Sequence, residues 1–207
     1  MTDGNSSSIS TARIILWSVV FLALGAFAFL LIERQATQGD AGAVSAQSPI
    51  GGPFTMTGPD GKAFTDKSLA GRPYAIFFGY TRCPDICPTT LARMGALRKA
   101  MGADGGKFDL VFVSVDPGHD KPADMARYAA LFGTPVIGLT GTEAQVAQIA
   151  KAYHIFYRKV PQPNGDYIMD HSAAVLLVDA KGNFVTTIDA EESQDMAIGK
   201  LRRLVAA

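Results

Sequence analysis

The chain has 207 residues, 48% of them hydrophobic, which is enough for one well-packed domain and an additional segment. Nineteen basic and nineteen acidic residues give a formal net charge of zero, so the sequence has neither the positive excess of a nucleic-acid-binding protein nor an acidic tail. With two cysteines, the chain is not a small scaffold held together by several disulfides.

The first predicted element is an apolar helix over residues 14–32, a stretch without any charged side chain. As a helix this stretch would be about 28 Å long, close to the hydrocarbon thickness of a bilayer. The alternative is a cleaved signal peptide, but the apolar core of a signal peptide is about 7–15 residues long. We therefore predict a short tail over residues 1–13 and an uncleaved transmembrane anchor over residues 14–32.

The short tail favours a topology in which the large C-terminal part is translocated. We expect a single-pass protein of the bacterial inner membrane with its soluble domain in the periplasm, because the N-terminus is too poor in arginine for a mitochondrial transit peptide. Residues 33–52 are rich in Ala, Gly, Gln and Ser and contain no aromatic residue, which predicts a flexible linker. A globular domain is expected over residues 53–207.

Strands and helices are predicted throughout this domain from hydrophobic periodicity and turn residues. In chain order they are a hairpin of residues 54–57 and 63–65, a buried strand over 74–78, a helix ending near 101–102, a buried strand over 108–115, helices over 122–132 and 143–153, a hairpin of 155–160 and 167–169, a hairpin of 174–178 and 184–188, and a helix over 193–205.

This order predicts an α/β fold, a mixed sheet with helices on both faces. A strand that leads into a cysteine-bearing helix start is typical of thioredoxin-like proteins. In open sheets of this kind, ligands bind beyond the carboxyl ends of the strands. Cys83 and Cys87 are expected at that edge, because they follow the strand over residues 74–78 directly.

Cys83 and Cys87 lie four residues apart in the run GYTRCPDICPTT, and each is followed by a proline. Because Pro88 inside a regular helix would lose a hydrogen bond to Pro84, we expect the helix to begin at Pro88, after an irregular turn. Free backbone N–H groups at the helix start favour the thiolate, which binds metals and attacks disulfides. The alternative is that Cys83 and Cys87 are ordinary buried cysteines with no functional role.

The spacing of the pair bears on whether it forms a disulfide or binds a metal. Residues four apart on a regular helix have Cβ atoms about 5–6 Å apart, whereas a disulfide needs about 3.5–4.5 Å. An irregular turn could close this gap, so both possibilities stay open. A metal tolerates the wider separation better, because each metal–sulfur bond adds about 2.3 Å.

His171 is the candidate third ligand, 84 residues beyond Cys87 and just before a predicted buried strand. Thioredoxin-like folds bring the loop before this strand against the cysteine loop, so His171 can complete a Cys2His set. Soft thiolates with an imidazole suit copper, with zinc as the alternative. A structural zinc site would need a fourth ligand, for which the sequence offers no clear candidate.

Other polar residues near the predicted site have two interpretations each. His119 is a weak alternative ligand in an exposed loop, and His154 is expected to be a partly exposed residue at a helix end. Asp85, Asp116 and Asp170 could orient the imidazole or give the metal a weak oxygen contact. Alternatively, Asp116 caps the turn into the next helix and the other two carboxylates face water.

Four stretches together resemble the Sco/SenC family of copper-binding, thioredoxin-like membrane proteins. They are FFGYTRCPDICPTTL at residues 77–91, VSVDP at 113–117, IGLTGT at 137–142 and DHSAAVLLVD at 170–179, and the resemblance extends over about residues 53–204. It implies that Cys83, Cys87 and His171 bind a copper ion. It also implies a role in assembling the dinuclear copper centre of cytochrome c oxidase, as copper donor, as thiol reductant for that centre's cysteines, or both.

One departure from the family pattern concerns the loop after VSVDP. The family usually has an arginine and a threonine there, as in ERDTP, whereas this chain has GHDKP at residues 118–122. A partner contact made through that arginine is therefore not carried over to this chain.

The favoured hypothesis is a membrane-anchored copper metallochaperone, which is not an enzyme. Its expected partners are the copper-receiving subunit of cytochrome c oxidase or another copper protein, and a thiol–disulfide reductant that keeps the cysteines reduced. The enzymatic alternative is a membrane-tethered thiol–disulfide reductase in which Cys83 attacks and Cys87 resolves, but residues 170–174 lack the cis-proline that such reductases carry there. A redox or copper sensor is a third possibility, for which the sequence shows no output module.

Overall fold

The computed structural model describes residues 17, 22, 25, 49–163 and 165–206. The chain divides into two compact units, Met1–Gln47 and Ser48–Ala207. The tail over residues 1–13, most of the anchor over 14–32 and most of the linker over 33–52 lie outside the described residues, so those three assignments stay predictions. In the part of the chain that is described, no helix has the length and apolar character needed to span a bilayer.

The second unit is built on a five-stranded mixed sheet with the strand order β5-β4-β3-β8-β9. Its strands are β3 (Tyr74–Gly79), β4 (Asp109–Ser114), β5 (Ile137–Leu139), β8 (Val175–Val178) and β9 (Phe184–Ile188). The first three are parallel to one another, β8 is antiparallel to β3, and β9 is antiparallel to β8. All six residues of β3 are buried, which explains its unbroken apolar sequence.

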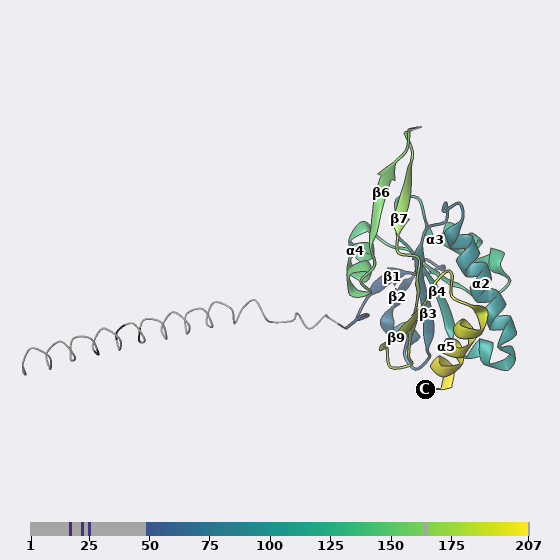
Figure 1. Cartoon of the computed structure of the whole chain (residues 1–207). Coiled ribbons are helices and arrows are strands. Elements are labelled where there is room, and N and C mark those ends of the chain that lie inside the picture. Colours follow the sequence, from purple (N-terminus) through teal and green to yellow (C-terminus); the bar gives the residue numbers. More distant parts are fainter. Residues whose placement is uncertain (1–16, 18–21, 23–24, 26–48, 164, 207) are drawn as a thin grey trace, which may run out of the picture. The chain divides into compact units, whose positions relative to one another are not determined.

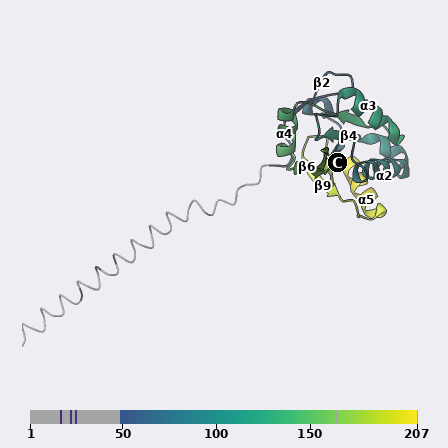
Figure 2. The same ribbon diagram turned by 90° about the horizontal axis from the view of Figure 1, so that it is seen from above.

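Helices cover both faces of this sheet (Figures 1 and 2). They are α2 (Ile86–Ala100), α3 (Pro122–Ala129), α4 (Glu143–Ala152) and α5 (Gln194–Ala206), with 3-10 turns at η1 (Asp66–Leu69), η2 (Gly102–Lys107) and η3 (Ala130–Phe132). The crossovers through α2 and α3 step in the same direction across the sheet, which places both helices on one face. There, α5 packs against α2, while α4 lies on the other face beside the hairpin of β1 (Thr55–Thr57) and β2 (Ala63–Thr65).

The remaining two strands, β6 (Tyr157–Pro161) and β7 (Tyr167–His171), form a separate antiparallel hairpin. Figure 1 shows this hairpin projecting from the end of the domain at which the carboxyl ends of β3 and β4 lie. His171 is the last residue of β7, at the base of the hairpin.

The predicted thioredoxin-like mixed sheet with flanking helices is confirmed, but three details of the prediction were wrong. The helix after Cys83 begins at Ile86 and not at Pro88. Pro88 is tolerated there because it lies in the first turn, where backbone N–H groups have no partner within the helix. The strand β5 was not predicted, and the helix predicted over residues 122–132 is divided between α3 and η3.

Candidate metal centre

The two cysteines lie where the loop after β3 leads into α2. Cys83 is in the loop and Cys87 is the second residue of α2, where its backbone N–H donates a hydrogen bond to the Cys83 sulfur at 3.4 Å. Both are free cysteines, Cys83 with 8% of its surface exposed and Cys87 with none. The more accessible sulfur is therefore the one that receives the free N–H of the helix start.

The two thiols differ in acidity. A hydrogen bond from the thiol side chain of Cys87 is the main cause that lowers the pKa of Cys83 to about 4; burial opposes it, and the His171 side chain and the backbone N–H of Cys87 lower the pKa further. The same hydrogen bond, together with burial, raises the pKa of Cys87. Without a metal the pair is accordingly one thiolate, on Cys83, and one thiol, on Cys87.

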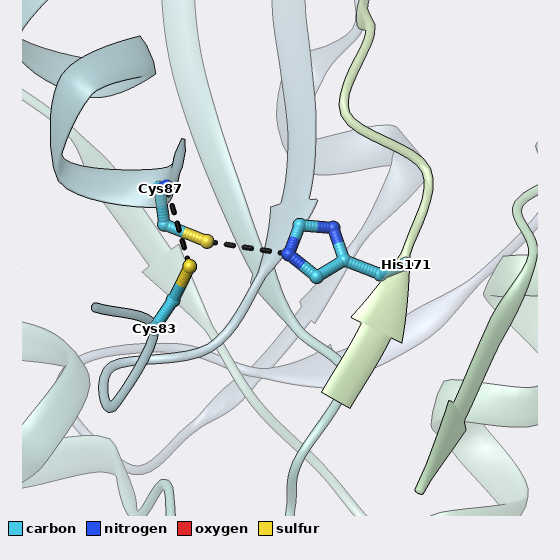
Figure 3. A group of neighbouring side chains, drawn as sticks. All are labelled: Cys83, Cys87 and His171. Atoms are coloured by element: carbon cyan, nitrogen blue, oxygen red, sulfur yellow. Dashed lines mark hydrogen bonds between the residues drawn. The ribbon is translucent and has the colours of Figure 1, made fainter. Parts of the chain in front are cut away.

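The ring of His171 is held in one orientation and one tautomer. Its Nδ1–H donates to the backbone carbonyl of Ser172 at 2.9 Å, so the lone pair of neutral imidazole is on Nε2, which lies 3.4 Å from the Cys87 sulfur (Figure 3). The rings of Phe77 and Tyr80 stand edge-on to the imidazole, with centroids at 6.1 and 5.9 Å. A backbone carbonyl that fixes a histidine in this way is a common arrangement at metal sites.

The structure brings together the three residues that the sequence singled out. The two sulfurs and a nitrogen of His171 all lie within 4.8 Å of one another. A three-coordinate metal with bonds of about 2.3 Å to sulfur and about 2.0 Å to nitrogen would need donor separations of about 3.7–4.0 Å, so small side-chain shifts would suffice. Within the described residues, no carboxylate joins this group.

Gly79, the last residue of β3, makes room for the Cys87 sulfur. A Cβ atom at position 79 would lie 2.6 Å from that sulfur and 2.9 Å from the ring of Phe112. Real Cβ atoms do not approach other atoms so closely, so the packing of Cys87 requires a glycine at this position.

The nearby aspartates do not touch the imidazole. The Asp85 carboxylate accepts from the Thr89 hydroxyl at 3.2 Å, and Asp170 pairs with Arg158 at 3.0 Å. The predicted alternative in which one of them orients His171 is wrong, because the Ser172 carbonyl has that role.

Asp116 and His119 contact each other and not the metal group. The Asp116 carboxylate is fully buried and lies 3.1 Å from Nδ1 of His119, so its side chain does not act as the simple cap of an exposed turn. His119 is also outside the cluster of possible ligands. His154 follows the end of α4, as predicted, but it is exposed and not only partly so, and its backbone has a φ of +55°.

Three polar residues that support the cysteine loop, Asp120, Thr81 and Ser114, were not predicted. The buried carboxylate of Asp120 accepts hydrogen bonds from the backbone N–H and hydroxyl of Thr81, at 3.1 and 2.6 Å, and from the hydroxyl of Ser114 at 2.6 Å. These bonds tie the loop before Cys83 to the end of β4. The aspartate follows a VDP run in the sequence, a signal that it belongs to an ordered turn, but its burial could not be read from the sequence.

A cavity of about 430 Å³ gives access to the centre from one side. It is lined by Cys83, His171, Tyr80, Met169 and Arg158, among others, and Cys87 is not part of its lining. A larger cavity of about 650 Å³ lies around Arg98 and Asp109, at the opposite ends of the strands, and includes none of the three clustered residues.

The fold and the three converging donors define a class, a thioredoxin-like protein with a Cys2His site of soft ligands. The SCO1/SenC family model matches residues 42–206. The chain is 32% identical to "Protein SCO2, mitochondrial" of Saccharomyces cerevisiae over 92% of this chain and 65% of that protein. The chain therefore belongs to the SCO1/SenC family, and it spans just under two thirds of the length of this relative.

Solved structures agree with this placement. ScoI of Bradyrhizobium japonicum with copper bound is 44% identical, with a TM-score of 0.69 over 75% of this chain and 99% of that one. BsSco, described with a disulfide switch and as a member of the Sco family of cytochrome c oxidase assembly proteins, is 28% identical, with a TM-score of 0.60 over 76% of this chain and 96% of that one.

Proposed function

We propose that this protein is a copper metallochaperone that binds one copper ion through Cys83, Cys87 and His171 and helps to assemble the dinuclear copper centre of cytochrome c oxidase. The observation that carries the proposal is the convergence of the three donor atoms within 4.8 Å beside an open cavity. The copper-bound relative and the assembly role of a second family member support the metal and the recipient.

The site is arranged for a metal that enters and leaves. Copper binding replaces the proton of the buried Cys87 thiol, while Cys83 is already a thiolate and Nε2 of His171 has its lone pair free. Three protein ligands leave one side open to the cavity, from which a thiolate of the recipient can attack the metal. Because copper transfer needs reduced cysteines, we include a thiol–disulfide reductant among the partners.

Copper titration of the reduced full-length chain in detergent tests the proposal. We expect one copper per chain, with a sulfur-to-Cu(II) charge-transfer band that disappears in Cys83→Ala. His171→Ala should lower the Cu(II) affinity by more than about tenfold, whereas His154→Ala, at an exposed histidine outside the site, should match the unmodified chain. A band that survives in Cys83→Ala would refute the ligand assignment.

A second candidate function is thiol–disulfide exchange, which the unequal thiols favour. The Cys83 thiolate would attack a substrate disulfide and release one substrate thiolate, and Cys87, after losing its proton, would attack the Cys83 sulfur and release the second. The substrate is reduced, Cys83 and Cys87 become a disulfide, and an external thiol reductant restores them. His171→Ala separates the functions, because a reductase keeps its exchange rate while a copper carrier loses affinity.

The location is also a proposal. The uncharged stretch over residues 14–32 supports a single anchor in the bacterial inner membrane with the copper-binding domain in the periplasm. The test is to isolate membranes, extract them with alkaline carbonate, and add protease to intact spheroplasts. Retention in the membrane with digestion of the domain is expected, and release by carbonate or protection from protease would contradict this.

A further inference from the structure

The hairpin of β6 and β7 carries His171 and, among the described residues, forms a sheet of its own that does not pair with the five-stranded sheet. The bonds between Phe156 and Ser172 that close its base join the two sides of the hairpin to each other, not to the cysteine loop. Near the base, the hydroxyl of Tyr80 is hydrogen-bonded to the backbone of Met169. The position of His171 relative to the sulfurs therefore depends on the contacts that fasten the hairpin to the body of the domain.

One of these contacts lies at Tyr167, the first residue of β7. Its hydroxyl donates to the buried carboxylate of Asp116 at 2.6 Å and lies 2.6 Å from Nδ1 of His119. Burial and the neighbouring Asp116 raise the pKa of Tyr167 to about 12, so the phenol keeps its proton and remains a donor at neutral pH. Asp116 belongs to the loop after β4, so this bond joins the hairpin to the edge of the central sheet.

Arg82 makes a second connection, from the residue directly before Cys83. Its guanidinium pairs with Asp166 beside the start of β7, at 3.0 Å, and with Asp116 at 3.5 Å. It also lies over the ring of Tyr167, with its central carbon 5.2 Å from the ring centroid. The cysteine loop, the loop after β4 and the hairpin thus meet at one cluster of side chains.

From this arrangement we propose that Tyr167 and Arg82 are positioning residues, which act through Asp116 to hold the hairpin so that His171 stays within reach of both sulfurs. The inference rests on the proposed function, since it concerns the retention of copper by the third ligand.

The strand itself transmits this constraint. Tyr167 and His171 are four residues apart on β7, about 13 Å along an extended strand, and side chains at even spacing point to the same face. Fixing Tyr167 against the body of the domain therefore turns His171 toward the cysteines. Without that contact, the pairs Arg82–Asp166 and Lys159–Glu143 and the contacts near the base still hold the hairpin, but less firmly, and Nε2 would spend more time away from the metal.

The test is the release of Cu(II) to an excess of EDTA from the full-length chain in detergent, followed through the charge-transfer band. Tyr167→Phe removes one hydroxyl and keeps the ring. We expect release about tenfold faster, which corresponds to the loss of one hydrogen bond to a charged group. The matched control is Tyr157→Phe in the same hairpin, because that hydroxyl has no hydrogen-bond partner among the described residues, and its release rate should equal that of the unmodified chain.

Three further measurements separate positioning from general destabilisation. Arg82→Met should also speed release, with Arg82→Lys partly restoring the slower rate because it keeps the charge. If both residues act through Asp116, the double variant Tyr167→Phe/Asp116→Asn should release copper no faster than the faster of its two single variants. Hydrogen exchange of the metal-free proteins should accelerate at the amides of β6 and β7 but not at those of β3 and β4.

The proposal is overturned if Tyr167→Phe releases copper at the unmodified rate, or if exchange accelerates equally in hairpin and core. These results differ from a failure of the proposed function, in which the unmodified chain itself would not bind copper. In that case hydrogen exchange of the metal-free proteins would still decide whether Tyr167 fastens the hairpin.

Discussion

The backbone N–H of Cys87 points at the sulfur of Cys83, 3.4 Å away, so the second cysteine stabilises negative charge on the first. This relationship exists because α2 begins at Ile86, which places Cys87 in the first turn, where backbone N–H groups are free of helical partners. The two residues of the pair therefore differ in exposure and in acidity although their sequence surroundings are similar.

The first prediction concerns alkylation of the metal-free protein. Because the pKa of Cys83 is about 4, its reaction with iodoacetamide should be nearly independent of pH between about 6 and 9, whereas an ordinary thiol accelerates with pH over this range. Cys87 should not react, since it is fully buried. Cys87→Ala removes the main cause of the low pKa and should restore a steep pH dependence, and a flat profile in that variant would contradict the assignment.

The second prediction concerns the protonation of His171 without metal. Burial by itself lowers the pKa of this imidazole, but the interactions with the Cys83 sulfur and the Ser172 carbonyl outweigh it and raise the pKa above its ordinary value. In Cys83→Ala the interaction with the Cys83 sulfur is lost while burial remains. The pKa of His171, measured as the midpoint of an NMR titration, should therefore fall. Nδ1 should carry the proton in the neutral ring. An unchanged midpoint, or a neutral ring protonated on Nε2, would count against this geometry.

A third prediction follows from the close approach of Gly79 to Cys87. Gly79→Ala should cost about 1–3 kcal/mol in the free energy of unfolding, because the new Cβ meets the Cys87 sulfur and the Phe112 ring together. It should also weaken copper binding, since the sulfur has to move. Gly106→Ala is the control, because a Cβ there has no atom within 4 Å. Urea unfolding of both variants makes the comparison, and equal stabilities would show that the sulfur is not confined.

A fourth prediction concerns Asp120, whose carboxylate accepts three hydrogen bonds in a buried setting. Asp120→Asn keeps the shape but turns an NH2 group toward donors, so about 1.5–3 kcal/mol of stability should be lost. Asp195→Asn, at an exposed position early in α5, should change stability by less than about 0.5 kcal/mol. A stable Asp120→Asn variant would mean that the loop before Cys83 does not depend on this carboxylate.

Much of the fold could be predicted because its central strands have a simple signature. The apolar sequences of β3 and β4 are unbroken because both faces of these strands are buried. The strand β5 escaped prediction because it is a three-residue segment, Ile-Gly-Leu, too short to show periodicity. The start of α2 was misplaced by two residues because a proline excludes a helix interior but not a first turn.

The metal centre was predictable to the extent that its residues have distinctive chemistry. Two cysteines that are each followed by a proline, together with a histidine before a buried strand, form an uncommon combination that indicates a metal site. The contacts that support the centre involve common residue types far apart in the sequence, such as Arg82 with Asp166. Such a contact depends on where the hairpin of β6 and β7 lies in space, which no local pattern encodes.

The cavity beside Cys83 bears on how a copper donor and a copper recipient would reach the site. Cys87 is fully buried and Phe77 and Tyr80 border the imidazole, so under the proposed function copper would reach and leave the site through the cavity that Cys83 and His171 line. Under the proposed function, a copper donor and a copper recipient that both reach the metal through this cavity would compete for the same surface, so an excess of either should slow transfer involving the other.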